Sequence, residues 1–232
     1  MAIYCTTDLH GNYNIWKQIQ NYLQEEDTLV FLGDAIDRGD RGFEIFKEML
    51  EDDRVIFIRG NHEQMMYDAW FVTWQGAFGH WLRNGGEKTI DNMRTLGLSD
   101  EEKEELVKKV ISLPCLLEYV TPQGYRIQLS HAGFTPNDAW DALPQNEQRY
   151  NLIWDRKHLV DEWPIKNDII VHGHTPIQHL LLKGIVGKTE TGIKLEYAMG
   201  HKICLDMGTI ESKVAVLFNL DTLTVEKTFI DN

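Results

Sequence analysis

The sequence predicts an α/β fold that contains both parallel and antiparallel strands. In its N-terminal part, short apolar stretches alternate three times with segments whose apolar residues recur at helical spacing, which is typical of parallel strands covered by helices. After Pro114, apolar stretches follow one another across turn residues, which indicates antiparallel pairing. Short polar motifs follow several of the predicted strands, where α/β folds assemble functional groups.

The first elements are three strands, each followed by a helix. The predicted strands cover residues 3–7, 28–32 and 55–58. The helices that follow them are expected at 13–23, near 43–50 and from Glu63 onward. The first helix is the clearest, because Ile15, Ile19 and Leu23 recur every four residues and would share one buried face.

The next elements are a helical insertion at about residues 65–113 and a strand-rich second half. The insertion is rich in aromatic residues such as Trp70 and Trp81, which we expect to pack in the core together with His80. A hairpin is predicted from 116–120 and 125–129, and further strands at 169–171, 203–206, 213–219 and 224–229. We expect all of residues 1–232 to form a single domain.

The composition indicates an acidic protein with its cysteines reduced. Asp and Glu number 36 against 23 Lys and Arg, so the formal net charge is −13, which argues against binding to nucleic acid or to an anionic membrane. Cys5, Cys115 and Cys204 are far apart and lie in apolar stretches, so we expect buried thiols. Neither a signal peptide nor a membrane-spanning run is recognisable, and we expect a cytoplasmic protein.

Five short motifs with acidic residues and histidines recur along the chain in a fixed order. They are Asp8-Leu9-His10-Gly11, Gly33-Asp34-Ala35-Ile36-Asp37-Arg38-Gly39, Gly60-Asn61-His62-Glu63, Ser130-His131-Ala132-Gly133 and His172-Gly173-His174-Thr175. Any one of them is a weak signal, but the ordered set at strand ends indicates a site that binds metal.

The residue types in these motifs suit two divalent cations. Hard or borderline dications such as Mn²⁺ prefer oxygen ligands with some imidazole. The candidate ligands are Asp8, His10, Asp34, Asn61, His131 and His174. Asp34 could bridge two ions roughly 3.5–4 Å apart, and a water shared by the ions would become hydroxide near neutral pH, the expected nucleophile.

The motifs also supply groups suited to a phosphoryl group. Arg38, Arg59 and Arg156 could bind phosphate oxygens through their guanidinium groups, which an acidic protein needs to hold an anionic substrate. His62 could donate a proton to the leaving oxygen while Asp37 orients its ring.

The ordered motifs resemble those of the phosphoprotein phosphatases within the calcineurin-like metallophosphoesterase superfamily. The run from Arg59 to Met66, with His80-Trp81-Leu82 and Asn84-Gly85-Gly86, is similar to the small bacterial and phage-lambda-type enzymes. The resemblance implies a β-sandwich of two mixed sheets flanked by helices, in four αββα layers. It also implies Asp8, His10 and Asp34 on one metal, and Asp34, Asn61, His131 and His174 on the other.

The resemblance further implies substrate contacts from Arg38, Arg59, Asn61 and Arg156, and a catalytic pair of His62 and Asp37. It implies that the chain is a metal-dependent phosphomonoester hydrolase, expected to act on phosphorylated serine or threonine, or also tyrosine, in proteins. Mn²⁺ is the expected ion, with Fe or Zn as alternatives. No site for a regulatory subunit is evident.

Two other functions are compatible with the same motifs. The same dinuclear site could cleave a dinucleoside polyphosphate such as diadenosine tetraphosphate, or the chain could be a binding protein that has kept the fold. We expect His172 to be a supporting residue at a strand end, and Glu63 either to orient a ligand or only to begin a helix. His158, His179 and His201 are expected at the surface.

Overall fold

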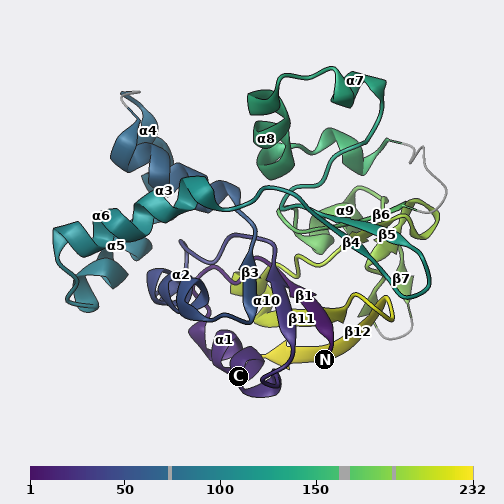
Figure 1. Ribbon diagram of the computed structural model, residues 1–232, viewed down its shortest axis with the longest axis horizontal. Coiled ribbons are helices and arrows are strands. Elements are labelled where there is room, and N and C mark those ends of the chain that lie inside the picture. Colours follow the sequence, from purple (N-terminus) through teal and green to yellow (C-terminus); the bar gives the residue numbers. More distant parts are fainter. Residues whose placement is uncertain (73–74, 162–167, 190–191, 232) are drawn as a thin grey trace.

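The computed structural model describes residues 1–72, 75–161, 168–189 and 192–231. Two five-stranded sheets pack against each other, and helices cover their outer faces (Figure 1). The expected α/β fold with four αββα layers is confirmed.

The first sheet has the strand order β12-β11-β1-β2-β3. Its strands are β1 (Ile3–Thr6), β2 (Thr28–Phe31), β3 (Val55–Phe57), β11 (Val214–Asn219) and β12 (Thr224–Ile230). β1, β2 and β3 are parallel, whereas β11 pairs antiparallel with both β1 and β12. The hairpin β11–β12 therefore completes the sheet that the first strand begins.

The second sheet has the order β4-β5-β6-β10-β9. Its strands are β4 (Leu117–Val120), β5 (Arg126–Leu129), β6 (Asp168–His172), β9 (Glu196–Tyr197) and β10 (Lys202–Cys204). β5, β6 and β10 are parallel, and β4 and β9 pair antiparallel at the two edges. A small separate hairpin joins β7 (Lys188–Thr189) to β8 (Gly192–Ile193).

The core between the sheets is made of apolar residues from the inner faces of both. Cys5 and Val30 come from the first sheet, Ile58 directly follows β3, and Ile127 and Val171 come from the second sheet. Their burial stabilises the sandwich, because apolar area removed from water contributes roughly 25 cal/mol per Å². The three cysteines are buried and free, as expected.

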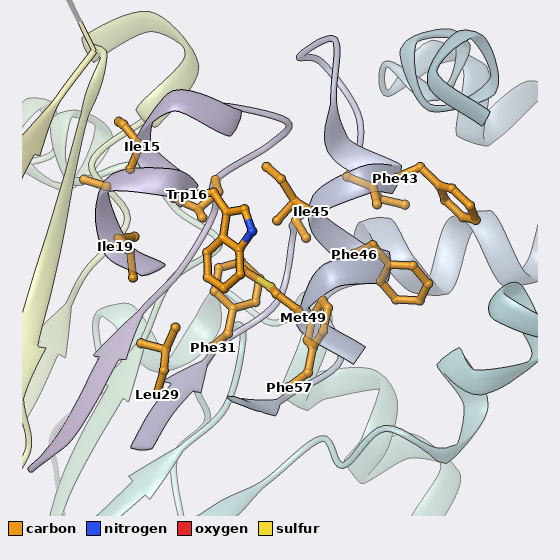
Figure 2. Packing of buried hydrophobic residues seen from close by; sticks show 14 of the residues in the cluster. Ile15, Trp16, Ile19, Leu29, Phe31, Phe43, Ile45, Phe46, Met49 and Phe57 are labelled. Atoms are coloured by element: carbon orange, nitrogen blue, oxygen red, sulfur yellow. The ribbon is translucent and has the colours of Figure 1, made fainter. Parts of the chain in front are cut away.

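Helices α1 (Tyr13–Tyr22) and α2 (Gly42–Glu51) cover the outer face of the first sheet. Figure 2 shows Trp16 of α1 and Phe46 of α2 above Phe31 and Phe57 of the sheet, with Phe46 and Phe57 in edge contact at 5.6 Å between ring centroids. The Trp16 indole N–H donates to Glu48 Oε2 at 2.7 Å, which satisfies a polar group that would otherwise be buried alone. Helices α8 (Gln145–Trp154) and α9 (Ile177–Leu182) cover the second sheet.

Four further helices lie together beside the sheets (Figure 1). They are α3 (Asn61–Phe71), α4 (Ala77–Arg83), α5 (Gly86–Thr95) and α6 (Asp100–Lys109). The short helices are α7 (Asp138–Asp141) and α10 (Thr209–Ser212), with 3₁₀ turns at Val110–Ser112, Lys157–Leu159 and Ala198–Gly200. Of the helices within the described ranges, none has the length and apolar character needed to span a membrane.

Candidate active site

The candidate ligands follow the carboxyl ends of parallel strands from both sheets. Asp8 follows β1, Asp34 follows β2, and Asn61 begins α3 after β3. His131 follows β5 and His174 follows β6. Because parallel strands end at the same edge of a sheet, this placement brings residues far apart in the sequence to one place.

Backbone hydrogen bonds join the loops that carry these residues. The backbone N–H of Asp8 donates to Gly33 O at 3.0 Å, and that of His10 donates to Asp34 O at 3.0 Å. The close approach depends on glycines. A Cβ on Gly60 would overlap Asp34 Oδ1, and a Cβ on Gly173 would overlap Asp8 Oδ2.

The backbone is strained where the site residues sit. Ten non-glycine residues of the described ranges have a positive φ, a conformation that costs an L residue free energy. Six of the ten belong to the candidate site: Asp8, His10, Asp34, Asp37, Arg38 and His174. Strain that gathers in one place and is held by surrounding bonds is typical of a functional site.

Asp34 lies at the centre of the cluster. Its Oδ2 is 3.7 Å from His10 Nε2, 3.3 Å from His131 Nε2 and 3.8 Å from His62 Nε2. It belongs to two groups of donor atoms close enough to hold a metal ion, one with His10 and His62 and the other with His131 and His174. The position of Asp34 therefore suits a carboxylate shared by two ions.

Asn61 and Asp8 complete the two sides of the cluster. Asn61 Oδ1 lies 2.8 Å from His131 Nε2 and 2.9 Å from His174 Nδ1. Asp8 Oδ1 lies 3.8 Å from His10 Nε2, and its Oδ2 accepts hydrogen bonds from the Thr7 hydroxyl and from the backbone N–H of His174. The six expected ligands are thus gathered at one point.

The chemistry of these donors fits divalent cations. His10 Nδ1 lies 2.9 Å from Ile36 O and His131 Nδ1 2.7 Å from Leu32 O, so in the neutral rings the proton sits on Nδ1 and the Nε2 lone pair faces Asp34. Burial disfavours charge on His131, yet Asp34 outweighs it and raises the pKa of His131 to about 9. The buried carboxylates attract positive charge, which metal ions would supply.

Glu63 holds two of the motif loops together. Its carboxylate is fully buried and accepts hydrogen bonds from the backbone N–H groups of Asp34, Ala35 and Gly60 at 2.9, 2.9 and 3.0 Å. Of the two roles considered for Glu63, the structure favours the first, because the carboxylate fixes the loop that carries Asp34.

His62 is held by a carboxylate on one side and faces the cluster on the other. Its Nδ1 lies 2.7 Å from Asp37 Oδ2, and Arg38 Nη2 lies 3.1 Å from its Nε2. Burial lowers the pKa of His62, but the negative charges of Asp34 and Asp37 outweigh it and raise that pKa above its ordinary value. A histidine oriented in this way can carry and deliver a proton at Nε2.

Two of the three expected phosphate-binding arginines line one cavity with a candidate ligand. Arg38, Arg156 and His174 line a cavity of about 550 Å³. Arg156 Nε donates to Thr175 Oγ1 at 3.1 Å, and both arginines are exposed. Their charges can therefore face an anionic substrate next to the metal-binding groups.

Arg59 is placed differently. It is buried, and its guanidinium donates to Gln64 Oε1 at 2.8 Å and to Ile111 O and Leu113 O at 2.7 and 3.1 Å. It lines another cavity, together with Trp154. Among the described contacts none joins Arg59 to Asp34 or to the histidines, so the structure shows it tying α3 to the turn after α6.

One buried acid beside the site and one buried histidine were not expected from the sequence. Asp206 follows β10, and burial together with the charge of Asp8 raises the pKa of its carboxyl well above the ordinary value. Its position after a parallel strand was the only signal available in the sequence.

His158 was expected at the surface, but its side chain is 1% exposed, which corrects that prediction. The imidazole packs over Gly133 and edge-on to His172. His172 itself is buried at the end of β6, where its Nε2 lies 2.7 Å from Tyr197 Oη.

The chain is similar to a known protein family and to proteins of known name. A family model described as calcineurin-like phosphoesterase matches residues 1–202. Serine/threonine-protein phosphatase 2 of Salmonella typhimurium is 28% identical over 190 residues, covering 76% of this chain and 81% of that protein. Serine/threonine-protein phosphatase 1 of the same organism is 26% identical over 196 residues, covering 82% of this chain and 86% of that protein.

Solved structures share the fold at low sequence identity. A protein provisionally assigned as a diadenosine tetraphosphatase has a TM-score of 0.61 and 12% identity, with 99% of this chain and 93% of that chain covered. A protein serine/threonine phosphatase from Saccharomyces cerevisiae has a TM-score of 0.58 and 13% identity, with 100% of this chain and 80% of that chain covered.

The family match covers most of the chain and implies a dinuclear divalent metal centre, and the two sheets bring together oxygen and imidazole donors that could hold metal ions. The chain belongs to the calcineurin-like phosphoesterase family and is a phosphatase of the hydrolase class.

Proposed function

We propose that this protein is a serine/threonine protein phosphatase, active also on phosphotyrosine, with Mn²⁺ as its activating ion and with Fe or Zn as alternatives. The metal ions would be held by Asp8, His10, Asp34, Asn61, His131 and His174. Once bound, they would activate a water molecule for attack on phosphorus and offset the charge of the phosphoryl group. The cytoplasmic location expected from the sequence is part of the same proposal.

The pair of His62 and Asp37 is the observation that carries this proposal. A protein that only bound phosphate would not need an imidazole braced by a buried carboxylate and directed at the centre of the cluster. The Nδ1 of His62 lies 2.7 Å from Asp37 Oδ2, which leaves Nε2 to deliver a proton. Serine and threonine are poor leaving groups as alkoxides, so their phosphoesters gain most from such a donor.

Arg38 and Arg156 would bind the phosphoryl oxygens. Arg38 Nη2 now donates toward His62 Nε2 at 3.1 Å. A phosphoryl group would attract that guanidinium through charge-assisted hydrogen bonds and leave Nε2 free to carry its proton. Substrate binding would thus prepare the proton donor.

A second candidate function is hydrolysis of dinucleoside polyphosphates, and one observation favours it. His80, Trp154 and Tyr150 form a row of rings, with Trp154 6.0 Å from His80 and 6.1 Å from Tyr150 between centroids. They line a cavity of about 540 Å³, and Trp154 also contacts His174. A row of aromatic rings beside a phosphate site could stack a nucleobase.

One assay tests the proposal against both alternatives. Metal-stripped protein, with and without added Mn²⁺, is given p-nitrophenyl phosphate, a phosphothreonine peptide and diadenosine tetraphosphate, with Asp34→Asn as the control. We expect Mn²⁺-dependent hydrolysis of the first two, lost in the control. Preference for diadenosine tetraphosphate would favour the second function. Metal binding without hydrolysis of any phosphoester would favour a binding protein.

A further inference from the structure

The α4–α5 hairpin contacts the loop that carries Asp37 and Arg38. The Trp81 indole N–H of α4 donates to Asp37 Oδ1 and Oδ2 at 3.0 and 3.1 Å. The Thr89 hydroxyl of α5 donates to Asp37 Oδ1 at 2.6 Å and accepts from the backbone N–H of Asp37 at 3.0 Å. Between the two helices, Gly85 O accepts from the backbone N–H of Arg38 at 3.3 Å.

The contacts of Trp81 and Thr89 with Asp37 are fully buried and leave little freedom to the groups involved. Trp81, Thr89 and Asp37 each have a relative exposure of 0%. Buried hydrogen bonds to a carboxylate are strong, because they replace its hydration and fix its direction. Asp37 and Arg38 also have φ values of 69° and 64°, so their loop needs such support to keep its shape.

We propose that Trp81 and Thr89 are positioning residues for the proton donor His62, acting through Asp37. They do not touch the substrate. They fix the Asp37 carboxylate so that its Oδ2 meets His62 Nδ1 and His62 Nε2 faces the leaving oxygen. The bond between phosphorus and that oxygen then breaks as the water-derived oxygen bonds to phosphorus, and the proton on Nε2 passes to the leaving oxygen. The inference rests on the proposed role of His62.

The aromatic residues of the insertion therefore differ from one another in role. The sequence favoured core packing for all of them. Gly86 lies flat against the Trp81 ring, where a Cβ would come within 2.7 Å, so Trp81 does pack in the core. Its indole N–H, however, links the helical insertion to the catalytic pair.

The test uses two substrates that differ in their need for a proton donor. p-Nitrophenol leaves without protonation, whereas the alcohol of a phosphothreonine peptide needs it. The readout is the ratio of kcat on the peptide to kcat on p-nitrophenyl phosphate, with metal content and KM measured in parallel. His62→Asn defines the full effect, which we expect to be a loss of about 100-fold or more in this ratio.

We expect Trp81→Phe and Thr89→Val each to lower the ratio by roughly 10-fold, with unchanged metal content and KM, because they disturb only the direction of the donor. Thr89→Ser should restore it. Trp16→Phe is the matched control, since it removes the indole–carboxylate hydrogen bond of another fully buried tryptophan, to the partly exposed Glu48, away from the site. Thr89→Val decides the question if Trp81→Phe does not fold.

The possible failures can be told apart. The positioning role would be overturned if Thr89→Val left the kcat ratio unchanged, or lowered kcat equally on both substrates, while His62→Asn still lowered the ratio. If His62→Asn lost activity equally on both substrates, the proposed proton donor itself would be wrong.

Discussion

Glu63 offers the sharpest test of how the motif loops are held. Replacing it by glutamine or alanine should lower the free energy of unfolding according to the number of buried N–H groups left without an acceptor. The carboxylate accepts hydrogen bonds from three of them: Oε2 accepts from the N–H groups of Asp34 and Gly60, and Oε1 accepts from that of Ala35. Glutamine can keep its oxygen at the Oε2 position, but its amide then faces the N–H of Ala35.

The magnitude follows from the cost of an unpaired buried polar group, about 1–3 kcal/mol. Glu63→Gln leaves two such groups, the N–H of Ala35 and the glutamine NH2 that faces it, and should lose about 2–6 kcal/mol. Glu63→Ala leaves three and should lose about 3–9 kcal/mol, comparable to the whole stability of a typical domain.

The assay is urea unfolding with a chelator, because bound metal would add stability of its own. Glu102→Ala is the matched control. Glu102 also accepts from the backbone three residues earlier, at Ser99, but it lies exposed on the surface, where water can replace the lost acceptor, so its loss should cost much less than that of Glu63. Similar losses for Glu63→Ala and Glu102→Ala would refute the reasoning.

Three further predictions follow from the site. Gly173→Ala should abolish metal binding and activity, since the added Cβ overlaps Asp8 Oδ2, and metal analysis of the purified variant would check this; full metal content would contradict it. Arg156→Ala should lower kcat/KM for phosphoesters by roughly 10- to 100-fold without changing metal content, and unaltered kinetics would remove Arg156 from the site. Burial holds the pKa of His158 well below its ordinary value. Below about pH 6.5 the His158 imidazole therefore binds a proton in the unfolded chain and stays neutral in the folded one. The free energy of unfolding in chelator should then fall by up to about 1.4 kcal/mol per pH unit, and His158→Phe should flatten that fall; parallel pH profiles would count against it.

The sequence predicted the fold well where local pattern and three-dimensional structure agree. The helix near residues 13–23 is found as α1, because one apolar face decides both its period and its packing. The candidate ligands could be selected because parallel strands bring their carboxyl ends together. Asp8 and His174 are far apart in the chain, yet the N–H of one donates to the carboxylate of the other.

The remaining features depend on contacts that leave no local trace. The partner of the Trp81 indole is a carboxylate 44 residues earlier, so the residue looked like ordinary core. His158 is buried because Gly133 has no side chain to keep the imidazole out. Asp206 carried no flanking motif, and only the pairing of β10 with β6 places it behind Asp8.

The order in which the first sheet is assembled has a consequence for synthesis on the ribosome. β1 pairs with β2 on one side, but its other neighbour, β11, lies about 200 residues further along the chain. The ribosome adds about 5–20 residues per second, so this edge of β1 stays unpaired for roughly 10–40 s before β11 has been synthesised. An apolar strand with an open edge can pair with another chain. The edge of β1 at residues 3–6 is therefore open to pairing between nascent chains, and slower synthesis would lengthen the exposure.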